Sequence, residues 1–107
     1  MSQETPFILQ GDQIMREGES RAFALTWSQF STISSGGCEA YVNGSTDSAT
    51  ILSGTTSFSE NVQTVPLITI PTGYGGLTVV VEPAMNSGGV VYKTGIVLHV
   101  LKPGASA

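Results

Sequence analysis

Residues 77–101 read LTVVVEPAMNSGGVVYKTGIVLHVL, and this stretch decides the fold. Leu77, Val79 and Val81 form one face of a two-residue alternation, which indicates a β-strand because strand side chains point to opposite faces in turn. Residues 86–89, NSGG, are typical of a hairpin turn. The alternation resumes over residues 90–101. We therefore predict two long strands joined by a hairpin.

The second of these strands carries more apolar residues than one buried face requires. Its predicted core face consists of Val90, Tyr92, Ile96, Leu98 and Val100, and its other face carries Lys93, Gly95 and His99. Apolar residues nevertheless fall on the faces opposite the core in both strands, namely Val80, Val91, Val97 and Leu101. Some of this surplus is expected to be an interface.

Outward from this hairpin, further segments alternate like strands at the spacing of a sandwich or barrel. They are residues 6–10, 21–28, 38–42, 49–52, 56–59 and 62–70. With the two hairpin strands these make eight segments, of which residues 6–10 are an edge element or an extended arm, and we predict a sandwich of about seven strands. Phe23, Leu25 and Trp27 are expected to share the core face of their strand. Pro66 indicates an edge or a bulge, because proline cannot donate to a sheet ladder. No segment has a sustained helical period, so we predict no helix longer than about one turn.

The length of 107 residues fits one domain. Residues 1–10 are expected to form an N-terminal arm or edge segment, and residues 11–107 a single β-sandwich domain. Cys38 is the single cysteine, so the sandwich has no internal disulfide, and this thiol is expected to behave as a small apolar side chain.

The charge balance excludes some classes of partner. Only 11% of residues are charged, against about 25% in a typical soluble protein. The net charge of −4 argues against nucleic acid, which is bound through clustered Lys and Arg. The first six residues lack the features of a secretory signal, and no apolar run is long enough for a membrane span. Synthesis in the cytoplasm with no membrane partner is expected.

The sequence offers little reactive chemistry. His99 is the only histidine, and no partner for a catalytic triad can be nominated from sequence proximity. The eight carboxylates are scattered. Asn43, Ser45 and Asp47 alternate as in a calcium loop but lack its fixed glycine and terminal glutamate. We expect no enzyme activity, no cofactor and no metal site.

Several structural motifs resemble small immunoglobulin-like virion proteins of tailed bacteriophages, including capsid decoration modules. They are Gly18-Glu19 before the Phe23/Leu25/Trp27 strand, residues 32–35 (TISS), 41–44 (YVNG), 52–54 (LSG) and 91–95 (VYKTG). The resemblance implies an immunoglobulin-like antiparallel β-sandwich. It also implies a non-enzymatic virion protein that binds the outside of a capsid or related particle, often as a homo-oligomer. Antibody-type domains differ in having paired cysteines.

Two surfaces follow as hypotheses. The interface with a virion protein or a second copy is expected to include Phe7, Ile8, Leu9, Val91, Val97, His99 and Leu101. The arm is expected to dock on a neighbouring subunit or a capsid lattice. Alternatively, the chain is a carbohydrate- or receptor-binding module of a phage appendage or bacterial surface protein. In that case an exposed Tyr74 beside Asn43 and Asp47 would contact the ligand.

Overall fold

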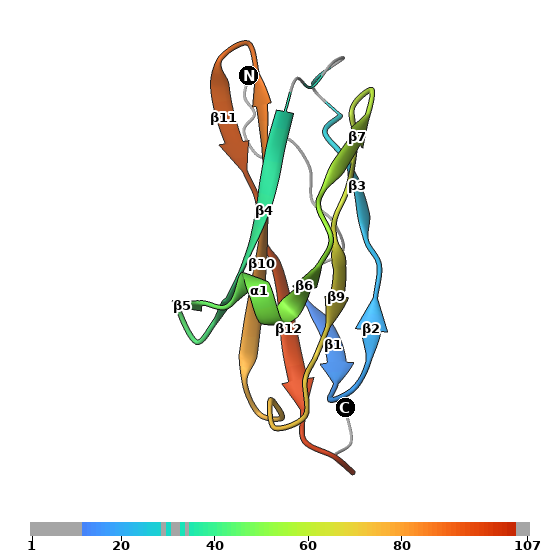
Figure 1. Ribbon diagram of the computed structural model, residues 1–107, viewed down its shortest axis with the longest axis vertical. Helices are drawn as coiled ribbons and strands as arrows, with labels where there is room; N and C mark the ends of the chain where they lie inside the picture. The colour runs from blue at the N-terminus through green and yellow to red at the C-terminus, as the bar shows by residue number, and fades with distance from the viewer. Residues whose placement is uncertain (1–11, 29, 31–32, 34, 105–107) are drawn as a thin grey trace.

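The computed structural model of the protein describes residues 12–28, 30, 33 and 35–104 (Figure 1). The predicted strand over residues 6–10, and the predicted arm that includes it, lie outside these residues. The described strands are β1 (Gln13–Arg16), β2 (Ser20–Arg21), β3 (Ala24–Thr26), β4 (Ser35–Val42), β5 (Ser45–Thr46), β6 (Leu52–Ser53), β7 (Ser57–Ser59), β8 (Val62–Thr64), β9 (Leu67–Thr69), β10 (Thr78–Ser87), β11 (Val90–Lys93) and β12 (Ile96–Leu101). One short helix, α1, spans Ser48–Ile51.

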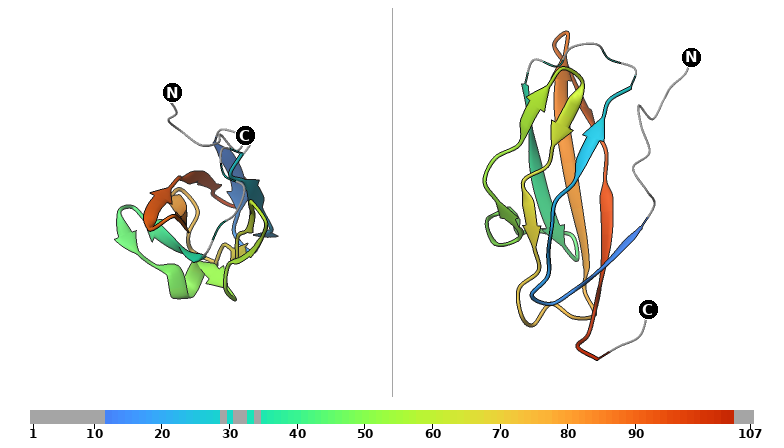
Figure 2. Two further views of the ribbon diagram at one scale, coloured as in Figure 1. Left: turned by 90° about the horizontal axis from the view of Figure 1, so that it is seen from above. Right: turned by 90° about the vertical axis from the view of Figure 1, so that its right-hand side faces the viewer.

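The strands form two layers around a core, so the predicted all-β sandwich is confirmed (Figures 1 and 2). One layer is a six-stranded sheet in the order β1-β12-β10-β4-β5, with β11 also paired to β10. The other layer consists of two three-stranded sheets, β2-β9-β6 and β3-β8-β7, which lie end to end. Several neighbouring strands can be counted as one interrupted strand, namely β2/β3, β6/β7, β8/β9 and β11/β12. On that count the structure has seven strands and, in addition, the two-residue β5.

The hairpin of β10 with β11 and β12 is confirmed, but the predicted strand over residues 90–101 is interrupted at residues 94–95. Both parts belong to one antiparallel register, since Ala84 lies opposite Lys93 and Val81 opposite Ile96. Thr94 donates its amide to the Pro83 carbonyl at 3.1 Å. Pro83 has no N–H to return that bond, which explains the gap in the ladder.

The strand β1 was not predicted, and its pairing departs from a purely antiparallel sandwich. Gln13 lies opposite Leu98 and Arg16 opposite Leu101, in parallel orientation. Met15 is the one completely buried residue of β1. A single inward apolar residue is too weak a pattern to identify a strand.

The predicted strand over residues 49–52 is wrong. Residues 48–51 form the single turn of α1, and Leu52 alone of the predicted range belongs to a strand, β6. The carbonyl of Asp47 accepts the amides of Thr50 and Ile51, and Ile51 is buried. With four residues, α1 agrees with the prediction of no helix beyond about one turn. Within the described part of the chain, no helix is long and apolar enough to cross a membrane.

The predicted break at Pro66 is confirmed, since β8 ends before it and β9 begins after it. Thr64 lies opposite Ala24, and Thr69 lies opposite Ser20. The chain therefore takes five residue steps from Thr64 to Thr69 but only four between Ser20 and Ala24, to which these residues are paired. One extra residue on one side of a ladder is the mismatch of a β-bulge.

The core lies between the two layers. It contains Leu25 and Trp27 as predicted, with Phe23 packed against it. It also contains the predicted Ile96, Leu98 and Val100, together with Met15, Ile33, Ala40, Ile51, Val65, Ile68, Ile70, Val79, Val81 and Met85. Val90, predicted to face the core, is 51% exposed because it follows the hairpin turn at one end of the sandwich. Tyr92 is half-buried against the core, in contact with Phe30.

Candidate interaction surface

The six-stranded sheet turns a second apolar face away from the core. Val79 and Val81 on β10 are completely buried. Since strand side chains alternate, Val80 points to the opposite side, and so do Val97 and Leu101 on β12. We call this side of the sheet the outer face, and its larger apolar residues are Ile14, Tyr41, Val80, Val91, Val97 and Leu101.

A continuous apolar row crosses three strands of the outer face. Val80 lies directly opposite Val97 on one side and opposite Tyr41 on the other. All three side chains are half-buried. Antiparallel sheets that face water usually carry polar residues on that side. Three apolar residues in direct cross-strand register depart from this polar pattern, and an exposed apolar row of this kind favours a contact surface.

One edge of the outer face is extended by β1. Ile14 is 44% exposed and lies opposite His99. The His99 ring nitrogen Nε2 donates a hydrogen bond to the Asp12 carboxylate at 2.8 Å, and both side chains are exposed. This contact joins β12 to the residue that precedes β1. An exposed pair of this kind contributes at most about 1 kcal/mol to stability.

The predicted interface residues have different positions in the structure. Val97, His99 and Leu101 alternate on β12 and share the outer face. Val91 lies farther along the same side, on β11, and is 58% exposed. The other three, Phe7, Ile8 and Leu9, lie outside the described residues.

Sequence reasoning missed Ile14 and Tyr41. Ile14 belongs to the unpredicted strand β1. Tyr41 stands between Ala40 and Val42 in the predicted strand over residues 38–42, so the alternation of that strand was a signal for its outward position.

Two of the three alternative ligand-contact residues, Tyr74 and Asp47, are in contact. The Tyr74 hydroxyl donates a hydrogen bond to the Asp47 carboxylate at 2.5 Å. This bond, followed by burial and by the charge of Asp47, raises the pKa of Tyr74. Asn43 accepts the amide of Thr78 through its side-chain oxygen at 3.5 Å. These polar atoms hold the loop 70–77 against β4 and β5, which gives them a role in the fold.

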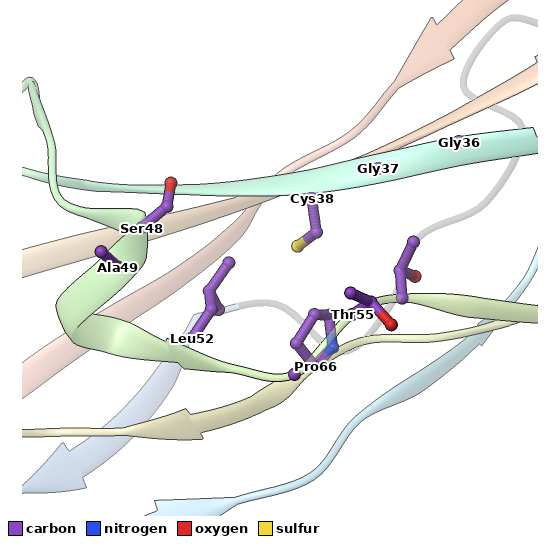
Figure 3. Close-up of a pocket in the computed structure, with 10 residues that line it drawn as sticks. Gly36, Gly37, Cys38, Ser48, Ala49, Leu52, Thr55 and Pro66 are labelled. Carbon is purple, nitrogen blue, oxygen red and sulfur yellow. The ribbon is translucent and has the colours of Figure 1, made fainter.

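A cavity of about 370 Å³ opens beside Cys38, between β4 and the segment from α1 to β7 (Figure 3). Its lining residues are Gly36, Gly37, Cys38, Ser48, Ala49, Leu52, Gly54, Thr55, Thr56 and Pro66, none of which is charged. Burial, followed by the charges of Glu39 and Glu82, raises the pKa of the Cys38 thiol to about 12. At neutral pH the thiol is therefore protonated and a poor nucleophile or metal ligand.

No group of three or more His, Cys, Asp or Glu side chains suited to a metal ion occurs among residues 12–28, 30, 33 and 35–104. The sequence matches no protein-family model, and searches of curated proteins and of solved structures find no match.

Proposed function

We propose that this protein is a non-enzymatic structural module of a phage virion, which binds the outer surface of a capsid or related particle and associates with copies of itself. The motif resemblance supplies the virion context. The surface proposed for the contact is the outer face of the six-stranded sheet. Binding to the particle and self-association can be tested separately.

The observation that carries the proposal is the row Tyr41–Val80–Val97 across β4, β10 and β12. Burying apolar surface contributes about 25 cal/mol per Å², so a flat sheet face of this kind can supply affinity without any specific chemistry. Ile14 and Leu101 enlarge the patch at the β1 side. Polar residues flank it, as at the rims of protein interfaces.

The charges around the row are mixed in sign, which suits a protein partner. Asp12, Arg16 and His99 lie at one side. At the other side Glu82 lies opposite Glu39 and forms a 3.9 Å pair with Lys93. A surface of this composition has no cationic stripe that would follow a phosphate backbone. Copies joined in a homo-oligomer would bind a symmetric particle at several points at once, so each contact could be modest.

Add-back to particles tests the proposed function. Particles would be purified from a phage whose copy of this gene is deleted, and increasing amounts of the purified protein would be added. After sedimentation, the proposal expects binding that saturates at a fixed ratio of this protein to the major capsid protein. Binding that rises without saturation, or absence of the protein from wild-type particles by mass spectrometry, would contradict it.

Light scattering on the free protein tests self-association independently. A mass above that of one 11.1 kDa chain, falling on dilution, supports a homo-oligomer. A concentration-independent monomer contradicts the oligomeric part of the proposal and leaves the particle-binding part to the add-back measurement.

A further inference from the structure

The cavity beside Cys38 opens along one edge of β4 (Figure 3). The Cys38 side chain points from β4 toward Leu52 and Pro66, which line the facing side. The described residues that line the cavity carry no charge, and several are small, namely Gly36, Gly37, Ala49 and Gly54. A buried ion needs a partner of opposite charge, and this lining supplies none. The cavity therefore suits an uncharged group that approaches the β4 backbone closely.

Backbone groups of β4 are directed into this cavity. The Ala40 amide donates to Ser48 Oγ at 2.9 Å, and the Ala40 carbonyl accepts the Asp47 amide at 2.8 Å. Both groups of Ala40 thus point away from β10, which pairs with the other edge of β4. Residues two positions apart in a strand direct their backbone groups the same way, so the N–H and C=O of Cys38 and of Gly36 point into the cavity.

The chain itself supplies partners for this edge of β4 up to the cavity. The strand β5 pairs with Tyr41 and Val42, and the residues that follow β5 bond to Ala40 as described above. The chain then turns into α1, which lines the cavity with Ser48 and Ala49. A further strand in line with β5 would continue the same ladder to Cys38 and Gly36.

We propose that this cavity binds a short extended segment of another polypeptide, which adds to the edge of β4 through backbone hydrogen bonds to Cys38 and Gly36. A polypeptide presents one N–H and one C=O per residue at strand spacing, which is the pattern that these two residues offer. The addition of an extended peptide to a sheet edge is a recurrent mode of recognition, in which pockets beside the edge select the side chains.

The shape of the cavity selects small, uncharged side chains on the bound segment. The cavity has a volume of about 370 Å³, and α1 bounds one end of it. The Phe58 ring packs against β4 at the other end, since a Cβ on Gly36 would lie 2.5 Å from this ring. Between these limits Leu52 and Pro66 form an apolar wall. A segment of a few residues such as Ala and Thr fits this space.

The proposed peptide site is separate from the outer face. The row Tyr41–Val80–Val97 points away from the core, whereas the cavity lies at the edge between the two layers. A contact of the outer face with a particle does not involve Cys38 or Gly36. The inference therefore goes beyond the proposed function and does not depend on it.

A capped peptide tests the site. We expect acetyl-Ala-Thr-Ala-Thr-amide, titrated into the isotope-labelled protein, to shift the NMR amide signals of Gly36 and Cys38 saturably, with a Kd of about 1 mM or lower. At saturation the Cys38 amide should exchange with solvent at least about fivefold more slowly. The Glu39 amide should exchange at nearly the same rate, because this residue pairs with Glu82 on β10.

A modified peptide separates backbone pairing from simple filling of the cavity. The same peptide with every backbone amide N-methylated keeps its side chains but donates no hydrogen bond, and it should bind at least about tenfold more weakly. Equal binding of the two peptides would overturn the proposal, because an apolar pocket alone would then account for it. Absence of saturation at about tenfold the expected Kd would overturn it as well.

Two neighbouring substitutions on α1 locate the bound peptide. Ala49 and Thr50 are both exposed, and of the two only Ala49 lines the cavity. Once equal unfolding midpoints show that both variants are folded, Ala49→Leu should bind the peptide at least about tenfold more weakly because the larger side chain occupies the cavity. Thr50→Leu should bind like the parent protein. Full affinity in Ala49→Leu would place the peptide elsewhere and contradict the proposal.

Discussion

The indole nitrogen of Trp27 donates a hydrogen bond of 2.9 Å to the side-chain oxygen of Gln63, and both residues are completely buried. The side-chain nitrogen of Gln63 donates in turn to the carbonyls of Gly37 and Ala84 and to the Thr56 hydroxyl. One amide thus joins both layers of the sandwich. A buried polar group with all its partners fixes the arrangement of a core, whereas an unpaired one is costly.

Replacing Gln63 should therefore destabilise the protein. Gln63→Leu leaves the Trp27 N–H without an acceptor, and we expect the free energy of unfolding to fall by about 1–3 kcal/mol. Urea unfolding followed by Trp27 fluorescence measures this. Thr64→Val, on the exposed side of the same strand, is the control and should change stability by less than about 0.5 kcal/mol. Equal stability of Gln63→Leu and the parent protein would contradict the assigned role of the amide.

Two adjacent glycines of β4 should respond very differently to alanine. A Cβ on Gly36 would lie 2.5 Å from the Phe58 ring and 2.9 Å from the Cα of Met85, whereas a Cβ on Gly37 meets nothing within 4 Å. Gly36→Ala should cost at least about 1–3 kcal/mol, the usual range for overpacking. Gly37→Ala should be close to neutral. Thermal unfolding of the two variants compares them directly, and a neutral Gly36→Ala would show that the layers are not packed as described.

The thiol of Cys38 should be unreactive in the folded protein. With its pKa raised to about 12, it carries far less thiolate at pH 8 than an ordinary cysteine. Alkylation by iodoacetamide should be at least about tenfold slower in the native protein than in 8 M urea, a denaturing control. Equal rates would mean that the thiol is not buried beside the cavity.

The bond from Tyr74 to Asp47 should make stability sensitive to alkali. The pKa of Tyr74 is raised above its ordinary value of 10.0 in the folded state. The folded protein then holds its proton more tightly than the unfolded chain, so this stabilisation is full below pH 10 and is lost as pH rises through the folded pKa. Tyr74→Phe lacks this dependence. Urea midpoints from pH 8 to about pH 11.5 should therefore fall more steeply for the parent protein than for Tyr74→Phe, and parallel curves would contradict the assignment.

The strong patterns of the sequence were sufficient for much of the fold. The alternation from Leu77 onward and the turn at residues 86–89 predicted the hairpin because long strands repeat their signal many times. The segment over residues 49–52 failed because four residues with one buried side chain, Ile51, fit one helical turn as well as a strand. The parallel pairing of β1 with β12 joins residues 85 positions apart, and no local pattern encodes it.

The candidate surface was predictable in part, because alternation along one strand shows which residues share a face. The surplus of apolar residues at Val80, Val97 and Leu101 could be read from alternation within one strand. Their alignment with Tyr41 depends on the register between strands, and the contact of His99 with Asp12 spans 87 residues. Such long-range relationships appear only when the sheet is assembled.

Binding of surface variants to gene-deleted particles tests the central claim, that the outer face of the six-stranded sheet makes the contact. Val97→Lys places a charge within the apolar row, and Thr26→Lys places the same charge on an exposed position of β3 in the other layer. Equal unfolding midpoints would first establish that both variants are folded. We predict that Val97→Lys binds at least about tenfold more weakly than the parent protein, a loss of about 1.4 kcal/mol, and that Thr26→Lys binds normally. Normal binding by folded Val97→Lys would contradict the claim.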